Sequence, residues 1–373
     1  MTLGPLIRDL REALGYSQGR LAELLCESAG RATVCREDIS RWENSKRTPG
    51  PFWLRHLAAV LEVPLTVLED AKLHRRRFLT DMAATAIAPV VAADLISSGF
   101  SAALAADGLP LDYWQDRLNV YGRDYMSLGA AEIQRRLAHD LVVLQQHLDQ
   151  PGMWEIAAKL MTLYGKTFPG SDGAKAANWY RMAAKAADRS GDDAARVWVR
   201  GRAAIALGYE GASLGMAEMF AEQAMQISDV PSLGRLNALM GKAHVAAIRG
   251  DRGTALSLLD EGRRVFDRAG SQEQTSDYAV PWWRMNVFVS LLAARLGEER
   301  LAVTAQDAAH AELPESLPRF ATHLEMHKGL MLVRAGDKSG GTAYARAALD
   351  RLPPEKHSLT LRLLMQEIEN GGH

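Results

Sequence analysis

Residues 36–49 read Arg-Glu-Asp-Ile-Ser-Arg-Trp-Glu-Asn-Ser-Lys-Arg-Thr-Pro, which predicts a short helix followed by a basic turn. Ile39 and Trp42 lie three residues apart, so they share one helix face and can anchor it in a core. The opposite face is polar and charged, which indicates a surface that contacts a partner. Its outward-facing side chains are Arg36, Glu37, Ser40 and Arg41.

Apolar residues on both sides of this stretch predict four more short helices. Residues 3–14 carry apolar side chains at helical spacing, and the glycine that follows can adopt a left-handed cap. Ser17 can cap the second helix, and Pro51 and Pro64 can begin the fourth and fifth. Five such helices can close a small core, so we expect residues 1–72 to form one domain.

This spacing resembles the phage-repressor-like helix-turn-helix family, also called the xenobiotic-response-element (XRE) family. The matching positions are Ser17-Gln18, Leu21-Ala22, Ile39 to Asn44, Lys46-Arg47, Pro49, Leu57-Ala58 and Leu61. The resemblance implies that the third helix enters the major groove of a double-stranded DNA operator, while the turn after it contacts phosphate. The implied DNA-binding residues are Gln18, Arg36, Glu37, Ser40, Arg41, Asn44, Lys46 and Arg47. One departure is the connection from Cys26 to Cys35, which is longer than the family's tight turn and could move the start of the third helix by one residue.

Charge is distributed unevenly along the chain. Residues 1–77 contain 13 Lys and Arg against 10 Asp and Glu, a formal +3, whereas the remainder contains 31 against 35, a formal −4. A module with such a small positive charge binds phosphate weakly. We therefore expect a homodimer that binds two half-sites.

The two cysteines, Cys26 and Cys35, are too few for a disulfide framework or a four-ligand zinc site in this chain of 373 residues. Their scarcity favours a reduced, cytoplasmic setting. A redox switch through this pair is an alternative to simple packing. A composition of 47% hydrophobic and 24% charged residues is ordinary for a soluble protein.

His74 to Thr80, followed by the apolar run Met82 to Ala93, looks like a twin-arginine export signal. Such signals act at the extreme N-terminus, and this apolar run is shorter than the ~20 residues that a membrane-spanning helix needs. We interpret residues 73–108 as a connector with one amphipathic helix, broken near Pro89. A membrane-anchored form is the less favoured alternative.

From residue 109 to 373 the sequence predicts helix after helix and no strands. Four joints recur, at Gly191-Asp192, Gly250-Asp251, Gly297-Glu298 and Gly336-Asp337. Small residues recur at set distances from these joints, and a further unit near Ala217 is expected to lack its glycine joint, so the units resemble degenerate tetratricopeptide repeats. The expected fold is all-α, with the helix-turn-helix domain followed by a right-handed solenoid of helical hairpins that also provides the dimerisation surface.

In tetratricopeptide domains the first helices of the hairpins line a concave groove that binds an extended peptide. Asparagine can hold a peptide backbone, and arginine or histidine can bind a carboxylate. The side chains that the resemblance places on first helices, facing inward, are Asn178, Arg181, Asn237, His244, Arg284 and Asn286. An alternative is that these residues are only solvated or capping residues.

Two short segments match enzyme motifs in sequence but lack the preceding strand that these motifs require. Gly211 to Gly215 matches a nucleophile elbow around Ser213, and Gly165-Lys166-Thr167 matches the end of a phosphate loop, but no strand precedes either. His323 and His327 are one helical turn apart with no third ligand, which is more typical of surface residues than of a metal site. We expect no enzyme activity, no cofactor and no metal.

The two modules together resemble bacterial regulators that join a helix-turn-helix to tetratricopeptide repeats, and the composition suits an actinobacterium. The resemblance implies a transcription regulator in quorum sensing, controlled by a signalling peptide or another small ligand. Two alternatives stay open. The repeats could dock a protein partner without a diffusible ligand, or the chain could be an esterase that uses Ser213.

Overall fold

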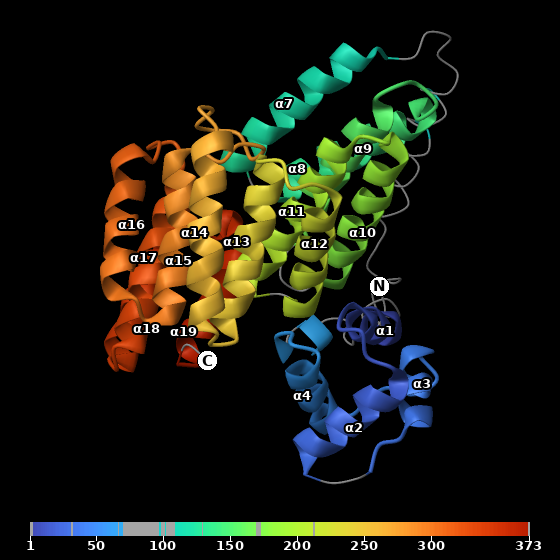
Figure 1. The fold of residues 1–373 in the computed structure, drawn as a ribbon, viewed down its shortest axis with the longest axis vertical. Coiled ribbons are helices and arrows are strands. Elements are labelled where there is room, and N and C mark those ends of the chain that lie inside the picture. Colours follow the sequence, from blue (N-terminus) through green and yellow to red (C-terminus); the bar gives the residue numbers. More distant parts are fainter. Residues whose placement is uncertain are drawn as a thin grey trace.

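The computed structural model describes residues 3–30, 33–65, 67–69, 109–128, 130–168, 173–211 and 213–371, with the single positions 97 and 101. Every regular element in these ranges is a helix, which confirms the all-α fold. Figure 1 shows a small N-terminal module beside a long row of upright helices. The predicted connector at residues 73–108, with its break at Pro89, lies outside the described ranges apart from those two positions.

The N-terminal module has the predicted helices. Ser17 Oγ accepts from the Arg20 amide and caps the second helix, Gly15 adopts a φ of 69° after the first, and Ile39 and Trp42 are buried. Positions 65 and 67–69 are helical where a fifth helix was expected, and Leu68 is buried. The four main helices are α1 (Leu3–Ala13), α2 (Gln18–Ala29), α3 (Arg36–Glu43) and α4 (Pro51–Val60).

A stack of helical hairpins follows. Two helices, α7 (Leu111–Ser127) and α8 (Ala130–Leu144), and a short 3-10 turn at Gln145–His147 precede it. One row contains the first helices of the hairpins, which are α9 (Met153–Lys166), α11 (Asp193–Glu210), α13 (Leu233–Ile248), α15 (Trp282–Leu296) and α17 (Pro318–Arg334). The second row contains α10 (Gly173–Ser190), α12 (Leu214–Ile227), α14 (Arg252–Ala269), α16 (Glu299–Glu312) and α18 (Lys338–Asp350). A 3-10 turn at Pro354–Lys356 leads to the last helix, α19 (Leu359–Glu369).

The hairpin joints correct two expectations. Gly211, with a φ of 65°, joins α11 to α12, so the hairpin that contains Ala217 has a glycine joint after all. Gly191 joins α10 to α11, and α10 packs mainly on α9, so this glycine connects two hairpins and does not lie within one. The joints within the hairpins at 211, 250, 297 and 336 are therefore 39, 47 and 39 residues apart. The sequence does not distinguish joints within a hairpin from joints between hairpins, because Gly-Asp pairs occur at both. The repeat spacing expected from the sequence was therefore wrong.

Gly-Asp pairs suit such joints for a physical reason. Gly250 has a φ of 79°, where a side chain would be strained, and Asp251 then accepts a hydrogen bond from the Thr254 amide at the start of α14. Gly336 and Asp337 repeat this arrangement at the start of α18. Only three residues thus separate the end of one helix from the start of the next at these two joints.

The helices α11 and α13 pack with their backbones in contact. A Cβ atom on Gly201 would lie 1.9 Å from the carbonyl oxygen of Gly234, and one on Gly208 would lie 2.5 Å from that of Gly241. Only glycine permits this approach, because any side chain would push the helices apart. The backbones of α11 and α13 therefore touch at the centre of the solenoid.

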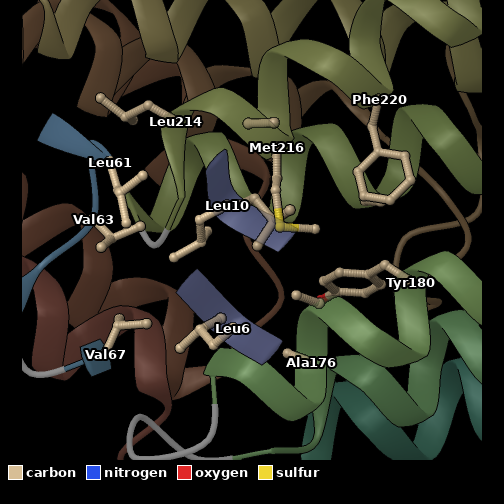
Figure 2. Packing of buried hydrophobic residues seen from close by; sticks show 14 of the residues in the cluster. Leu6, Leu10, Leu61, Val63, Val67, Ala176, Tyr180, Leu214, Met216 and Phe220 are labelled. Carbon is tan, nitrogen blue, oxygen red and sulfur yellow. The ribbon is translucent and has the colours of Figure 1, made fainter. Parts of the chain in front are cut away.

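The N-terminal module shares a hydrophobic core with the first hairpins. Figure 2 shows Leu6 and Leu10 of α1 next to Tyr180, Met216 and Phe220 of the solenoid, and all five are buried. Polar contacts lie around this core. Arg181 pairs with Asp9 and donates to its carbonyl oxygen at 3.1 Å, and Arg249 Nε donates to Glu62 at 3.0 Å. The module is therefore held against the solenoid by both apolar and ionic contacts.

No helix in the described ranges is long and apolar enough to cross a membrane.

Candidate DNA interface and groove cavity

Helix α3 begins at Arg36, as its sequence suggests, despite the long connection before it. Cys35 is the N-cap, and its backbone amide donates to Asp38 Oδ2 at 3.3 Å, which fixes the first turn. Part of this long connection is helical, because α2 continues to Ala29 and ends at Gly30 with a φ of 64°. Cys26 donates from Sγ to the Val34 carbonyl, and both cysteines are free.

The predicted base-contacting residues lie on the open face of α3. Arg36, Glu37 and Arg41 are exposed and Ser40 is half-buried, whereas Ile39 and Trp42 are buried on the other face. In the turn that follows, Asn44, Lys46 and Arg47 are also exposed. The structure thus brings seven of the eight predicted residues to one accessible surface.

Gln18 and Asn44 differ from the others because their side-chain amides are already hydrogen-bonded within the module. Gln18 Nε2 donates to Glu43 Oε2 at 2.7 Å, and Glu43 is buried between α1, α2 and α3. Asn44 uses Nδ2 to cap α3 through the Ser40 carbonyl at 2.8 Å and accepts from Arg8. These two residues position α3, and a DNA contact by either would add to that role.

Within the described ranges, the ion pairs of Arg41 and Arg47 are long and exposed. Arg41 and Arg47 each place Nη1 near Asp38 Oδ1, at 3.7 Å and 3.6 Å. Exposed pairs of this kind contribute about 0–1 kcal/mol, so phosphate or a base can replace them readily. The basic turn is therefore available for an anionic backbone.

The six predicted ligand residues separate into two groups. Asn178 and Arg181 lie on α10, which is the second helix of its hairpin, so their expected placement on a first helix is wrong. Asn178 is exposed and Arg181 binds Asp9 of the N-terminal module. The four that do lie on first helices, and are buried, are Asn237, His244, Arg284 and Asn286.

Of these six, Arg284 lines a cavity on the first-helix side of the solenoid. The cavity volume is about 70 Å³, and its walls come from α7, α9, α11, the loop before α15, α15, α17 and the start of α19. Asn286 donates to the Trp282 carbonyl one turn earlier in its own helix at 2.9 Å, and His244 contacts Arg295 at 3.2 Å. Neither lines this cavity.

Asp277 is the centre of a buried cationic cluster at the cavity. Lys166 Nζ lies 2.6 Å from Asp277 Oδ1, Arg202 Nη2 lies 2.7 Å from it, and Arg284 Nη2 lies 2.9 Å from it. Arg284 also holds the loop between α14 and α15 that carries Asp277, because its Nη1 donates to the carbonyls of Asp277 and Ala279 at 3.1 Å and 2.9 Å. Arg319 adds a fourth cation to the cavity wall.

Burial and mutual repulsion shift the ionisation of this cluster. Burial alone would raise the pKa of Asp277, but Arg202 and Lys166 outweigh it and hold that pKa well below its usual value. Burial and the neighbouring Arg202 lower the pKa of Lys166 well below its usual value, and they lower the pKa of Arg284 to about 10. The cations are thus crowded around one carboxylate.

Glu210 is the second carboxylate among the described residues of the cavity wall. Burial raises its pKa to about 7, against the opposing effects of a hydrogen bond from Thr360 and of Lys166 and Arg202. Glu210 also lines a larger cavity of about 770 Å³ between the N-terminal module and the solenoid, together with Glu62 and Leu65. The end of α11 therefore touches both cavities.

The histidines on α17 were expected at the surface, and this expectation is wrong. His327 is fully buried and bridges Tyr209 Oη at 3.1 Å and Ser290 Oγ at 3.0 Å, and His323 is buried on the cavity wall. Burial and Arg319 lower the pKa of His323 to about 3, and burial with His323 lowers that of His327. Among the described residues no cluster of three or more His, Cys, Asp or Glu could hold a metal ion.

Sequence reasoning missed Lys166, Arg202, Asp277 and Arg319. Lys166 entered the sequence analysis only as part of Gly165-Lys166-Thr167, an incomplete match to a phosphate-loop motif. In the structure it is the last residue of α9. Arg202 offered a signal, because it is the single charge in the apolar run from Gly201 to Tyr209. Asp277 offered none, since it lies 111 residues from Lys166 in an irregular segment.

No family model and no curated protein matches this chain. Among solved structures, a match was found to Bacillus thuringiensis PlcR in complex with the peptide PapR7 and DNA, at 15% sequence identity and a TM-score of 0.36. The match covers 72% of this chain and 95% of that chain. A likeness of this degree carries no inference about what this chain binds.

Proposed function

We propose that this protein is a sequence-specific DNA-binding transcription regulator that acts as a homodimer. The observation that carries the proposal is the accessible surface of α3 and its basic turn, where Arg36, Glu37 and Arg41 are exposed over a buried anchor. Arginine can bind the two acceptors of guanine, and glutamate can accept from cytosine. Two copies compensate for the small positive charge of the module.

The repeat domain in this proposal is the sensor and binds a signalling peptide or another small ligand on its first-helix side. Support comes from the cavity there and from α11, whose last residue, Glu210, lines both this cavity and the one beside the N-terminal module. A ligand that favours one arrangement of α11 would shift the position of the DNA-binding module. The spacing of the two modules in a dimer decides which operators fit.

The DNA half is tested by selecting bound fragments from sheared genomic DNA with the purified full chain and with Arg41→Ala. We expect the wild type to enrich a sequence with two half-sites and Arg41→Ala to lose about 1–3 kcal/mol of discrimination at one base position of each half-site. Arg263→Ala, an exposed arginine on α14, is the matched control. Equal enrichment of the same sequences by Arg41→Ala would overturn the role of α3.

The sensor half is tested with fractionated cell extract in two measurements on the purified protein, gel filtration and operator affinity. A change in operator affinity caused by the small-molecule fractions supports a diffusible ligand. Co-elution with a large protein, without any effect of small fractions, would instead support a docking surface and contradict this part of the proposal.

A further inference from the structure

The cavity on the first-helix side has more positive charge than its own carboxylates can balance. Among the described residues, three arginines and one lysine line it against two carboxylates, Asp277 and Glu210. Burial lowers the pKa of Lys166 and raises the pKa of Glu210, so three arginines face one carboxylate, Asp277, whose pKa is held low. The four basic side chains are Lys166, Arg202, Arg284 and Arg319. Uncompensated charges in a buried site are strongly unfavourable unless an anion accompanies them.

The arginines of the cavity wall also have unused hydrogen-bond donors. A guanidinium has five N–H donors, and within the described residues Arg202 donates one hydrogen bond, to Asp277, and Arg319 donates one, to the Tyr125 carbonyl. Arg202 is 4% exposed, and its Nε has no partner among the residues that the structure describes. Arg284 has its Nη1 and Nη2 committed to the loop from Ser276 to Ala279, and its Nε also has no partner among the residues that the structure describes.

Aromatic rings make cation–π contacts with Lys166 and Arg319 at the cavity wall. Lys166 Nζ lies 4.4 Å from the centre of the Tyr125 ring, and the Arg319 guanidinium lies 5.3 Å from Tyr125 and 5.5 Å from Phe320. Such contacts fix a cation and leave its remaining N–H donors free for a ligand. The volume of about 70 Å³ is enough for one small anionic group with water, and too small for a whole peptide.

We infer that this cavity is a binding site for the anionic end of the ligand, a carboxylate or phosphate group held by Arg202 and Arg319. This inference rests on the proposed sensor role and specifies its chemistry. Arg284 contributes charge and positions Asp277 through the loop, and Lys166 holds the Asp277 carboxylate. The rest of the ligand would then extend along the first helices.

The test uses the full chain and two probes, inorganic phosphate and acetate. Binding is followed by phosphorus NMR line broadening for phosphate and by saturation-transfer NMR for acetate, at constant ionic strength set with chloride. Arg319→Gln is the main variant, because Arg319 is half-buried and its removal leaves the Asp277 cluster intact. Arg235→Gln, a partly buried arginine paired with Glu261, is the matched control, and Arg202→Gln is a second variant.

We expect saturable binding of at least one probe, weakened on the order of tenfold or more by Arg319→Gln and unchanged by Arg235→Gln. Binding of acetate alone assigns a carboxylate ligand, binding of phosphate alone assigns a phosphate ligand, and binding of both supports the shared anion site. No saturable binding of either probe, or equal binding by wild type and Arg319→Gln, overturns the inference. Operator binding without ligand, measured on wild type and Arg319→Gln, tests the proposed function separately, because that measurement does not involve the cavity.

Discussion

Arg11 on α1 and Glu43 on α3 form a buried ion pair, with the arginine Nε 2.6 Å from Glu43 Oε1. The same carboxylate accepts from Gln18 on α2 at 2.7 Å, so one side chain connects the three helices that place the proposed DNA-contacting surface. Because Glu43 fixes the buried side of α3, the residues on the exposed face of α3 keep their orientation.

Glu43→Ala should therefore loosen α1 and α3. The change leaves the Arg11 guanidinium and the Gln18 amide without their acceptor, and breaking a buried pair in this way typically costs about 3–5 kcal/mol. We expect faster hydrogen exchange in α1 and α3, measured by mass spectrometry on the full chain, and weaker operator binding. Glu23→Ala, which removes an exposed pair with Arg20, should change exchange little. Equal protection in both variants would show that the pair has no organising role.

Gly201→Ala should destabilise the centre of the solenoid. The added Cβ would meet the Gly234 carbonyl at 1.9 Å, so α11 and α13 must separate, and overpacking of this kind costs about 1–3 kcal/mol or more. The thermal midpoint of the full chain at a fixed scan rate should fall. Gly253→Ala is the control, because its nearest neighbour would be Asp251 Oδ1 at 3.8 Å. That change should leave the midpoint unaltered or raise it slightly.

Leu214→Asp should release the N-terminal module from the solenoid. Leu214 is 7% exposed and lies in the shared core near Leu61 and Val63, as Figure 2 shows. A carboxylate there would cost about 3 kcal/mol or more if the interface stayed closed. We expect a larger radius of gyration in small-angle scattering, with helix content retained. Val230→Asp, at a side chain that is 62% exposed, should leave the radius unchanged. An unchanged radius for Leu214→Asp would contradict the docked arrangement.

Glu210→Gln should stabilise the protein at pH 8 and flatten its pH dependence. The ordinary pKa of 4.5 is raised to about 7 by burial, so between these values the folded chain retains a proton that the unfolded chain has lost. Stability therefore falls as pH rises through this window and is not recovered above it. The full shift corresponds to about 3 kcal/mol, and we expect less because Glu210 keeps some solvent contact. Urea unfolding of the full chain at pH 5 and pH 8 measures the difference between the variants, and a steeper pH dependence in Glu210→Gln would refute this assignment.

The N-terminal helices could be predicted because their signals are local. Ser17, Gly15 and Pro51 act on the residues next to them, and Ile39 and Trp42 lie on one helix face wherever that helix packs. The all-helical repeats could be predicted for the same reason. The pairing of their helices could not, since Gly191 and Gly211 have the same left-handed conformation at joints of different kinds.

The sequence by itself thus determined the helices, their caps and the surface of α3 that carries Arg36 and Arg41. The tertiary structure alone decided which charges share the cavity, because Lys166 and Asp277 are brought together across 111 residues by the stacking of helices. It also decided that the end of α11 touches both the cavity and the space beside the N-terminal module. Caps and helical periodicity act within a few residues, whereas a buried charge cluster depends on distances that exist only after the hairpins have packed.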